Sequence, residues 1–377
     1  MELRVSPRAA GWLLVAVAAV FAGLELFAVL GGGVVAGGDY LPLRHAAEAL
    51  WGGRTVFEDP SFVYPPTAAV VLLPTAFGSL SFGFAAWVLA GFAALLFAAW
   101  LVAREAPARF RPAVLGVAVM GLAGGVIASR SLFLGNLSEF LVPLAVGILL
   151  AFHRGRWVLG CALLAASLLV KPLLVPLLLV PLLHRRWGAL MRTMMPAGAL
   201  LLLSMLVVPG GSHFPSVLRY CLTGTNLHGE HAIYNLSLRG WAEAKGVPHL
   251  IGVLAALTVV AAVATRVRGA TPIRLGTALL FATFLAGSIS EVHYLLSGYA
   301  AALLCLVAER APVRVWAWFV PGLLLLALPG PYLQLILGYP NDGQSWLVGA
   351  ELLILVALLA TTRAEDRAVA PHALAPA

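Results

Sequence analysis

Long apolar runs separated by short polar turns make up most of the chain. The runs are continuous rather than alternating, which is typical of membrane-crossing helices and not of the strands of a membrane barrel. Because a crossing needs ~20 residues, the pattern predicts an all-α polytopic membrane protein with about ten to twelve transmembrane helices. The runs lie near residues 11–30, 66–79, 82–103, 113–128, 132–152, 157–183, 188–208, 248–265, 275–290, 294–308, 315–329 and 346–362.

Short basic turns between the runs predict how the chain is oriented. They lie at 104–111, 153–156, 184–186, 266–274, 310–314 and 363–367. Placing all of them in the cytoplasm together with the N-terminus satisfies the positive-inside rule. The loops 32–65 and 209–247 then lie outside the cell. The first run could be a signal peptide cleaved near Val34-Val35-Ala36, but its length and the runs that follow favour an uncleaved helix.

Two of the runs do not fit a simple crossing in this topology. The segments 66–79 and 157–183 must be re-entrant or unusually short for the chain to return to the correct side. The second is interrupted at Lys171-Pro172 and at Pro176, where the missing backbone donors predict kinks. An alternative topology uses 66–79 as a true crossing and leaves Arg104 on the outer side. This alternative topology also places the loops 32–65 and 209–247 outside the cell.

Composition narrows the class of protein further. The 377 residues are 61% hydrophobic and only 11% charged, which excludes an ordinary soluble domain. The net charge of +8 comes from cations in short turns, so it indicates orientation in the membrane and not nucleic-acid binding. The three cysteines share no short spacing, which argues against a disulfide framework or a zinc site. We expect one membrane domain over residues 1–367 and a short, disordered cytoplasmic tail over 368–377.

The first outer loop holds the first candidate for chemistry, Asp39. From Tyr40 onward, apolar residues recur at helical spacing with Arg44, His45 and Glu48 between them, which predicts a helix in the headgroup plane. Asp39 would stand at the start of that helix. Capping the helix, worth roughly 1 kcal/mol, and acting as a catalytic base are equally good interpretations of this carboxylate.

Further along, polar residues interrupt the apolar runs. Tyr64 precedes Pro65-Pro66 at a membrane boundary, where an interfacial anchor is the simpler interpretation. Arg130, Asn136 and Glu139 flank the outer end of one predicted helix. Lys171 lies within an apolar run, and a cation there costs at least ~2.5 kcal/mol at the bilayer centre, which favours a functional site over a structural pair with Glu139.

Two more groups lie on the outer side. Glu291, His293 and Tyr294 join two apolar helices, where a histidine is more often structural than catalytic. The second outer loop is dense in polar and aromatic residues, which suits a sugar or headgroup pocket: Arg219, Tyr220, His228, Glu230, His231, Tyr234, Asn235 and Arg239. The chain has no phosphate-binding loop and no Asp-x-Asp motif, so nucleotide-sugar chemistry at a soluble domain is unsupported.

The order of these motifs resembles a known group of enzymes. The outer Asp39-Tyr40, Tyr64-Pro65-Pro66, Gly135-Asn136 after Arg130, Lys171-Pro172, Asn235-Leu236-Ser237-Leu238 and Ser290 before His293-Tyr294 are similar to the GT-C glycosyltransferases. Within them, the pattern resembles glycosyltransferase family 87, the polyprenol-phosphate-mannose-dependent α-mannosyltransferases of actinobacteria. Members often have Gly-Gln where this chain has Gly135-Asn136.

The resemblance implies a GT-C-like helical bundle whose outer loops form the active site. It implies a bacterial plasma-membrane enzyme that moves a hexose, mannose being favoured, from a polyprenyl-phosphate sugar to a glycolipid or envelope glycan acceptor. The transfer would invert the anomeric carbon, with Asp39 as the base and His293 as a second functional residue. Candidate substrate-binding residues are Tyr40, Tyr64, Arg130, Asn136, Lys171, Arg219, Asn235, Arg239, Glu291 and Tyr294.

Elementary chemistry agrees with that expectation. A polyprenyl phosphate is already a good leaving group, so one carboxylate suffices and no acid partner is needed. No metal or other cofactor is expected if Lys171, Arg130 and Arg219 or Arg239 converge on the phosphate. The alternative is a transporter or flippase of a lipid-linked substrate, which would show polar residues reaching both faces and an internal repeat. A membrane acyltransferase lacks support, because no catalytic His-Asp pairing is visible.

Overall fold

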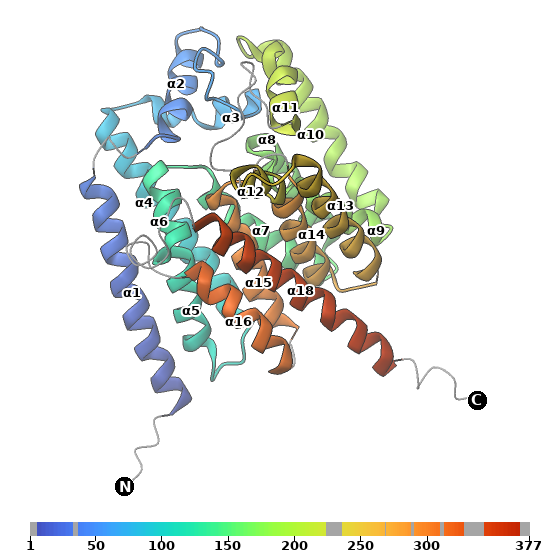
Figure 1. Cartoon of the computed structure of the whole chain (residues 1–377). Coiled ribbons are helices and arrows are strands. Elements are labelled where there is room, and N and C mark those ends of the chain that lie inside the picture. The colour runs from blue at the N-terminus through green and yellow to red at the C-terminus, as the bar shows by residue number, and fades with distance from the viewer. Residues whose placement is uncertain are drawn as a thin grey trace.

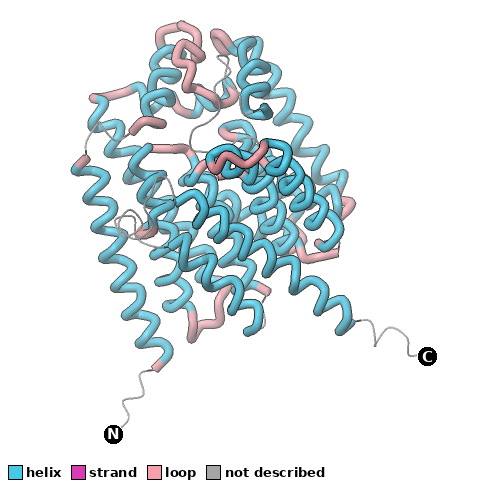
Figure 2. The backbone as a smooth tube through the Cα atoms, in the orientation of Figure 1, coloured by secondary structure: helices cyan, strands magenta, loops and turns pink. Residues whose placement is uncertain are grey.

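In a computed structural model the chain forms a bundle of helices, and every regular element described is helical (Figures 1 and 2). The structure describes residues 6–32, 37–223, 236–267, 269–287, 290–309, 313–327 and 343–369. The α-helices are α1 (Pro7–Gly31), α2 (Tyr40–Trp51), α3 (Pro66–Val71), α4 (Leu80–Arg104), α5 (Arg111–Ala123), α6 (Val126–Leu134), α7 (Ser138–His153), α8 (Trp157–Val170), α9 (Leu179–Leu183), α10 (Trp187–Val207), α11 (Phe214–Thr223), α12 (Leu238–Ala244), α13 (His249–Arg266), α14 (Pro272–Ala286), α15 (Leu295–Ala308), α16 (Val313–Ala327) and α18 (Gly343–Val369). The 3₁₀ helices are η2 (Leu73–Ala76), η3 (Pro172–Leu178), η4 (Gly211–His213) and η5 (Val292–Tyr294).

Several of the helices have the length and composition of membrane spans. Among the described residues α1, α4 and α10 are each long and apolar enough to cross, and α5 with α6, bent by 45°, could form a fourth span. Shorter apolar helices include α7, α8, α13, α14 and α15. The prediction of an all-helical protein with several apolar helices is therefore confirmed. The number of crossings and the GT-C arrangement stay predictions.

Three breaks in the helices position the polar residues. The expected runs 113–128 and 132–152 fold as three helices, because the chain breaks at Gly124-Gly125 and again at Gly135. Gly135 has φ of 68°, and a Cβ atom there would lie 2.8 Å from the Cβ of Tyr40, so only glycine fits this turn. The predicted break at Lys171-Pro172 is confirmed: α8 ends at Val170, and Lys171 is extended, with φ of −152°.

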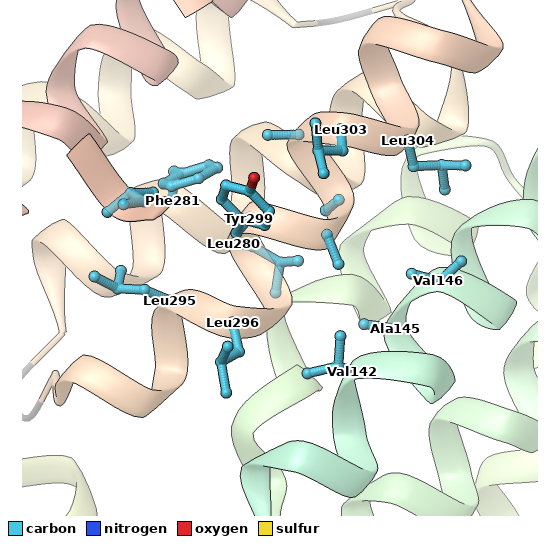
Figure 3. Close-up of a cluster of buried hydrophobic side chains, with 14 of the residues drawn as sticks. Val142, Ala145, Val146, Leu280, Phe281, Leu295, Leu296, Tyr299, Leu303 and Leu304 are labelled. Carbon is cyan, nitrogen blue, oxygen red and sulfur yellow. The ribbon is translucent and has the colours of Figure 1, made fainter. Parts of the chain in front are cut away.

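The centre of the bundle is apolar. Side chains of α7, α14 and α15, including Val142, Phe281 and Leu296, belong to one buried cluster (Figure 3). On α15, Tyr299 is fully buried, and its hydroxyl donates a hydrogen bond to the carbonyl of Val117 in α5 at 3.1 Å. The tyrosine ring packs directly over the backbone of Gly121.

The short elements α2, α3 and α11 gather at one end of the bundle, and α1 begins at the opposite end (Figure 1). The predicted helix after Asp39 is confirmed as α2, and its apolar positions Leu43 and Ala47 are fully buried. The segment 66–79 forms only the short helices α3 and η2, which are too short to cross a membrane on their own.

A buried ion pair joins the N-terminal end of α14 to the C-terminal end of α15. The guanidinium of Arg274 lies 2.7 Å from a carboxylate oxygen of Glu309, and both side chains are almost completely buried. The hydroxyl of Thr271 donates a hydrogen bond to the same carboxylate. This ionic group lies about 20 Å along α14 from its other end, at 1.5 Å per residue.

Candidate active site

Asp39 does not cap α2, although it occupies the N-cap position. Its side chain makes no capping hydrogen bond. Instead, Oδ2 of Asp39 accepts a hydrogen bond of 2.6 Å from Nδ2 of Asn136. The backbone N–H of Asp39 donates to the carbonyl of Leu134 at 2.9 Å, which ties the start of α2 to the end of α6. The capping interpretation is therefore wrong, because the carboxylate is turned away from the helix it precedes.

Asn136 links Asp39 to the cation of the site. It is 2% exposed and follows the left-handed turn at Gly135. Its Oδ1 accepts hydrogen bonds from Nζ of Lys171 at 2.7 Å, from the backbone N–H of Ser138 at 3.0 Å and from the Ser138 hydroxyl at 2.9 Å. The amide therefore bonds to the carboxylate with one end and to the ammonium with the other.

Lys171 reaches this cluster because α8 stops there and the chain turns extended. Its Nζ donates to Oδ1 of Asn136 and to Oγ of Ser138 at 3.1 Å, and it lies 3.4 Å from Nε2 of His293. An ammonium has three N–H donors, so all three have neutral acceptors. In the part of the chain that the structure describes, Lys171 forms no ion pair with Glu139, whose carboxylate accepts from Ser131 instead. The structural pair considered from the sequence is wrong.

Aromatic rings surround the ammonium. Nζ of Lys171 lies 4.9 Å from the ring centre of Tyr294 and 5.5 Å from that of Tyr64. Such cation–π contacts stabilise a partly desolvated cation. Tyr64 is only 6% exposed, so interpreting it as an interfacial anchor is also wrong.

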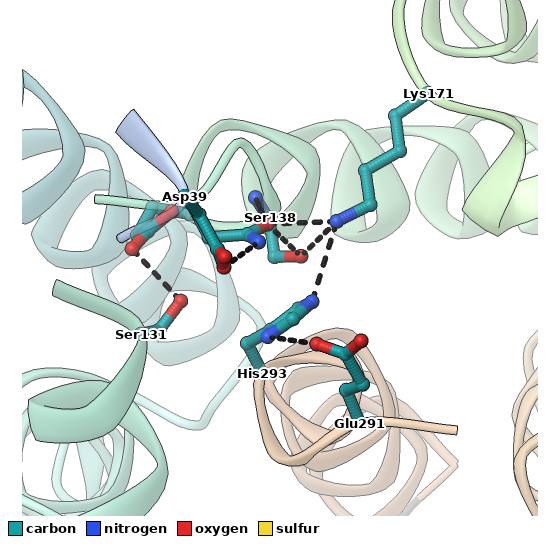
Figure 4. A network of polar contacts seen from close by, with 8 residues as sticks. Asp39, Ser131, Ser138, Lys171, Glu291 and His293 are labelled. Carbon is teal, nitrogen blue, oxygen red and sulfur yellow. Dashed lines mark hydrogen bonds and ion pairs between the residues drawn. The ribbon is translucent and has the colours of Figure 1, made fainter. Parts of the chain in front are cut away.

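His293 and Glu291 approach from the other side, on the segment between α14 and α15 (Figure 4). Nδ1 of His293 lies 3.4 Å from a carboxylate oxygen of Glu291. Burial raises the pKa of Glu291, and the nearby charge of Asp39 raises it further, whereas Lys171 and Arg130 oppose this rise. Asp39, Lys171 and His293, from three distant parts of the sequence, thus converge on one space.

Arg130, on α6, lies near the same space and is half-buried. Its charge acts on Glu291, and within the described residues its guanidinium makes no hydrogen bond or ion pair. A half-buried guanidinium in that state has donors to spare for a ligand. A planar fork of N–H donors matches the oxygens of a phosphate.

The remaining predicted residues are not all brought to this space. Tyr40 is fully buried and its ring packs on Phe84 and Trp87, so the structure gives it a packing contact. Arg239 of α12 pairs with Glu243 of the same helix at 3.2 Å. Arg219 lies on α11, next to Tyr220 and Cys221. The residues His228, Glu230, His231, Tyr234 and Asn235 lie outside the described residues.

A comparison with known families gives this geometry a chemical context. The family model of glycosyltransferase family 87 matches residues 62–298, which is more than half of the chain. The chain belongs to glycosyltransferase family 87. No curated protein sequence matches it. The matched segment of this glycosyltransferase includes Asn136, Lys171 and His293, whereas Asp39 precedes it.

Sequence reasoning missed two contributions to the glycosyltransferase site. Ser138 forms hydrogen bonds with both Asn136 and Lys171. Because Ser138 follows Asn136 by only two residues, the sequence could have predicted that the two side chains lie close together. Cys221 of α11 lies close enough for the charge of Lys171 to oppose the rise in its thiol pKa that burial causes. Nothing in the sequence around Cys221 pointed to this position.

Among the residues that the structure describes, one group of side chains could hold a metal ion. Asp39, Glu291 and His293 offer one ligand atom each, and these atoms lie within 4.8 Å of one another. Two carboxylates and an imidazole would suit a divalent cation. The ammonium of Lys171, however, lies 3.4 Å from Nε2 of His293, and its charge would repel a dication in that space. The expectation of a metal-free enzyme stays a prediction.

Proposed function

We propose that this glycosyltransferase moves a hexose, mannose being favoured, from a polyprenyl-phosphate sugar to a lipid-linked or envelope glycan acceptor with inversion. The observation that carries the proposal is the state of Asp39. Its carboxylate is not used to cap α2 and is held by Asn136 beside a buried ammonium. A carboxylate and a cation held apart in one hydrogen-bonded cluster are the two groups that such a transfer needs.

Asp39 is the general base of the proposed reaction. The acceptor hydroxyl attacks the anomeric carbon on the face opposite the phosphate, and its proton passes to Asp39. The bond between that carbon and the phosphate oxygen breaks, and its electron pair leaves with the polyprenyl phosphate. The leaving phosphate needs no proton from an acid, which is why a second catalytic carboxyl group is unnecessary.

Arg130 and Lys171 have different tasks toward the phosphate. Arg130 contacts it directly through two N–H groups, because its guanidinium has no other partner among the described residues. Lys171 contributes its charge from a fixed position and exchanges its longest contact, the 3.4 Å approach to His293, for a phosphate oxygen. Together they stabilise the charge that gathers on the leaving group.

The proposed site faces the outside of a bacterial plasma membrane. The support is the cytoplasmic placement of the basic turns, which puts the loop containing Asp39 on the other side. Donor and acceptor are both lipid-borne in this scheme, so they reach the site by diffusion in the outer leaflet. Mass spectrometry of envelope glycolipids from a deletion strain would identify the sugar and the acceptor.

The replacement Asp39→Asn tests the proposal. In a purified enzyme given polyprenyl-phosphate mannose and a lipid acceptor, turnover should fall by roughly 10²-fold or more, while donor binding and thermal stability stay near wild type. The matched control is Asp59→Asn in the same outer loop, where the carboxylate pairs with His45 at 2.9 Å. Turnover near wild type in Asp39→Asn would exclude Asp39 as the base.

A further inference from the structure

We propose that Asn136 is a positioning residue: it holds Asp39 and Lys171 apart and leaves Oδ1 of Asp39 as the atom that takes the acceptor proton. This inference rests on the proposed function, in which Asp39 is the base. It assigns Asn136 a role other than contact with substrate, because the described contacts already engage both ends of its amide.

The hydrogen bonds fix which way the amide points. Lys171 and the backbone N–H of Ser138 can only donate, so the atom that they share must be the carbonyl oxygen of Asn136. The nitrogen then faces Asp39, and a carboxylate can only accept from it. Reversing the amide would set donor against donor on one side and acceptor against acceptor on the other. The neighbours therefore permit one orientation only.

The same contacts distinguish the two oxygens of Asp39. Oδ2 receives the 2.6 Å hydrogen bond from Asn136, whereas Oδ1 accepts none from the described residues. The backbone of Asp39 is anchored to Leu134, and its side chain is anchored through Oδ2. An anchored carboxylate with one uncommitted oxygen has a fixed direction in which it can receive a proton, and fixed geometry is a large part of catalytic power.

Asn136 also prevents a direct ion pair between Asp39 and Lys171, which would disable the site. Asp39 and Lys171 are both within hydrogen-bond distance of one small amide, yet they form no ion pair within the described residues. Without the amide, opposite charges so close in a buried place would attract strongly and pair directly. A direct pair would weaken the carboxylate as a base and neutralise the charge intended for the phosphate. The neutral amide of Asn136 separates the two groups, so that the carboxylate of Asp39 stays available as a base and the ammonium of Lys171 stays available to the phosphate.

The replacement Asn136→Leu in the full-length enzyme tests the inference. Because a shift of about 1 Å can cost 10²-fold, we expect kcat for transfer from polyprenyl-phosphate mannose to fall by roughly 10-fold or more. The donor KM should rise as well, because a direct pair between Asp39 and Lys171 takes charge away from the phosphate. The control is Ser131→Ala, which removes a buried hydrogen bond between α6 and α7, from Ser131 to Glu139, and should keep kcat. An equal loss of kcat in both variants would overturn the proposal, because the effect would then be general.

A double-mutant cycle with Asp39→Asn shows whether Asn136 acts through Asp39. In that background Asn136→Leu should cause little further loss, because the group that it positions is already gone. A full additional loss would show that Asn136 acts independently and would overturn the inference. If Asp39→Asn alone keeps its turnover, the proposed function fails instead, so the two failures are distinguishable. Asn136→Ser, too short to bridge both partners, replaces Asn136→Leu if the latter does not fold, and full turnover in it also overturns the inference.

Discussion

Nε2 of His293 lies 3.4 Å from the ammonium of Lys171, and this distance fixes the state of the imidazole. An ammonium has no lone pair, so Nε2 must be the unprotonated acceptor. The ring proton is then on Nδ1, which faces Glu291 at 3.4 Å. His293 is thus a neutral acceptor for Lys171, and Glu291 selects its tautomer. In this arrangement His293 helps to orient the cation and has no proton on Nε2 to donate.

Replacing Lys171 by Met should weaken donor binding while leaving the fold intact. Met has a similar length and no charge, and a hydrogen bond to a charged group is worth about 1.5–3 kcal/mol, so donor affinity should fall by about 10- to 100-fold. Titration with polyprenyl-phosphate mannose measures it. Lys245→Met is the matched control, since Lys245 is the only other lysine and is exposed at the end of α12. Unchanged affinity in a folded Lys171→Met protein would rule out the phosphate contact.

The native Cys221 and an introduced Ser61→Cys should both react with a membrane-impermeant maleimide from outside the cell. Ser61 is exposed, and Cys221 is partly exposed beside the site, whereas the other two cysteines are buried. Burial raises the pKa of the Cys221 thiol, so labelling should be faster at higher pH. A Cys221→Ser protein provides the blank. Labelling of both positions only after the inner face is opened would put the proposed chemistry on the wrong side.

Removing divalent cations should leave turnover unchanged. Lys171 already supplies a positive charge beside Asp39, Glu291 and His293, and it opposes a dication there. Dialysis against a chelator, followed by assay with and without added Mn²⁺, Mg²⁺ or Zn²⁺, is the measurement. A loss of turnover that one of these ions restores would establish a metal site and contradict the expectation.

Replacing Arg274 by Met should destabilise the protein without changing the chemistry. It removes the guanidinium that lies 2.7 Å from the buried carboxylate of Glu309, and losing one partner of a buried ion pair costs about 3 kcal/mol or more. We expect a lower Tm in detergent, and a normal kcat at temperatures where the protein is folded. The double variant with Glu309→Gln should recover part of the loss, because the buried group at position 309 is then neutral and no longer needs a cation beside it. A normal Tm in Arg274→Met would contradict this account.

The sequence predicted the helices well where composition alone decides them. The first apolar run and the helix after Asp39 both form near the expected residues. In these two segments the local hydrophobic pattern and the residues at the helix start are enough to determine a helix. The sequence did not predict that α6 is a separate helix. That break depends on Gly135, whose left-handed turn is demanded by the close approach of Tyr40, and no local pattern reveals a contact across about 95 residues.

The site was predicted in its members but not in its connections. Asp39, Lys171 and His293 stood out as polar residues in apolar or interfacial places, which is a signal that a single sequence contains. That Asn136 lies between the first two could not be predicted, since hydrogen bonds across the bundle depend on tertiary packing. The same limit applies to Lys171, for which Glu139 was the nearest plausible partner in the sequence and the wrong one.

The packing of Tyr299 on Gly121 limits which inherited changes the gene can tolerate. A Cβ atom at position 121 would collide with the tyrosine ring, so every missense change of that codon adds atoms where α5 and α15 already touch. Helix α15 begins at Leu295, two residues after His293, so a displacement of the helix would move His293 as well. An alteration in the apolar interior would then be scored as a loss of sugar transfer, although no residue of the site had changed. Genetic screens for inactive alleles should therefore recover Gly121 alongside the polar residues.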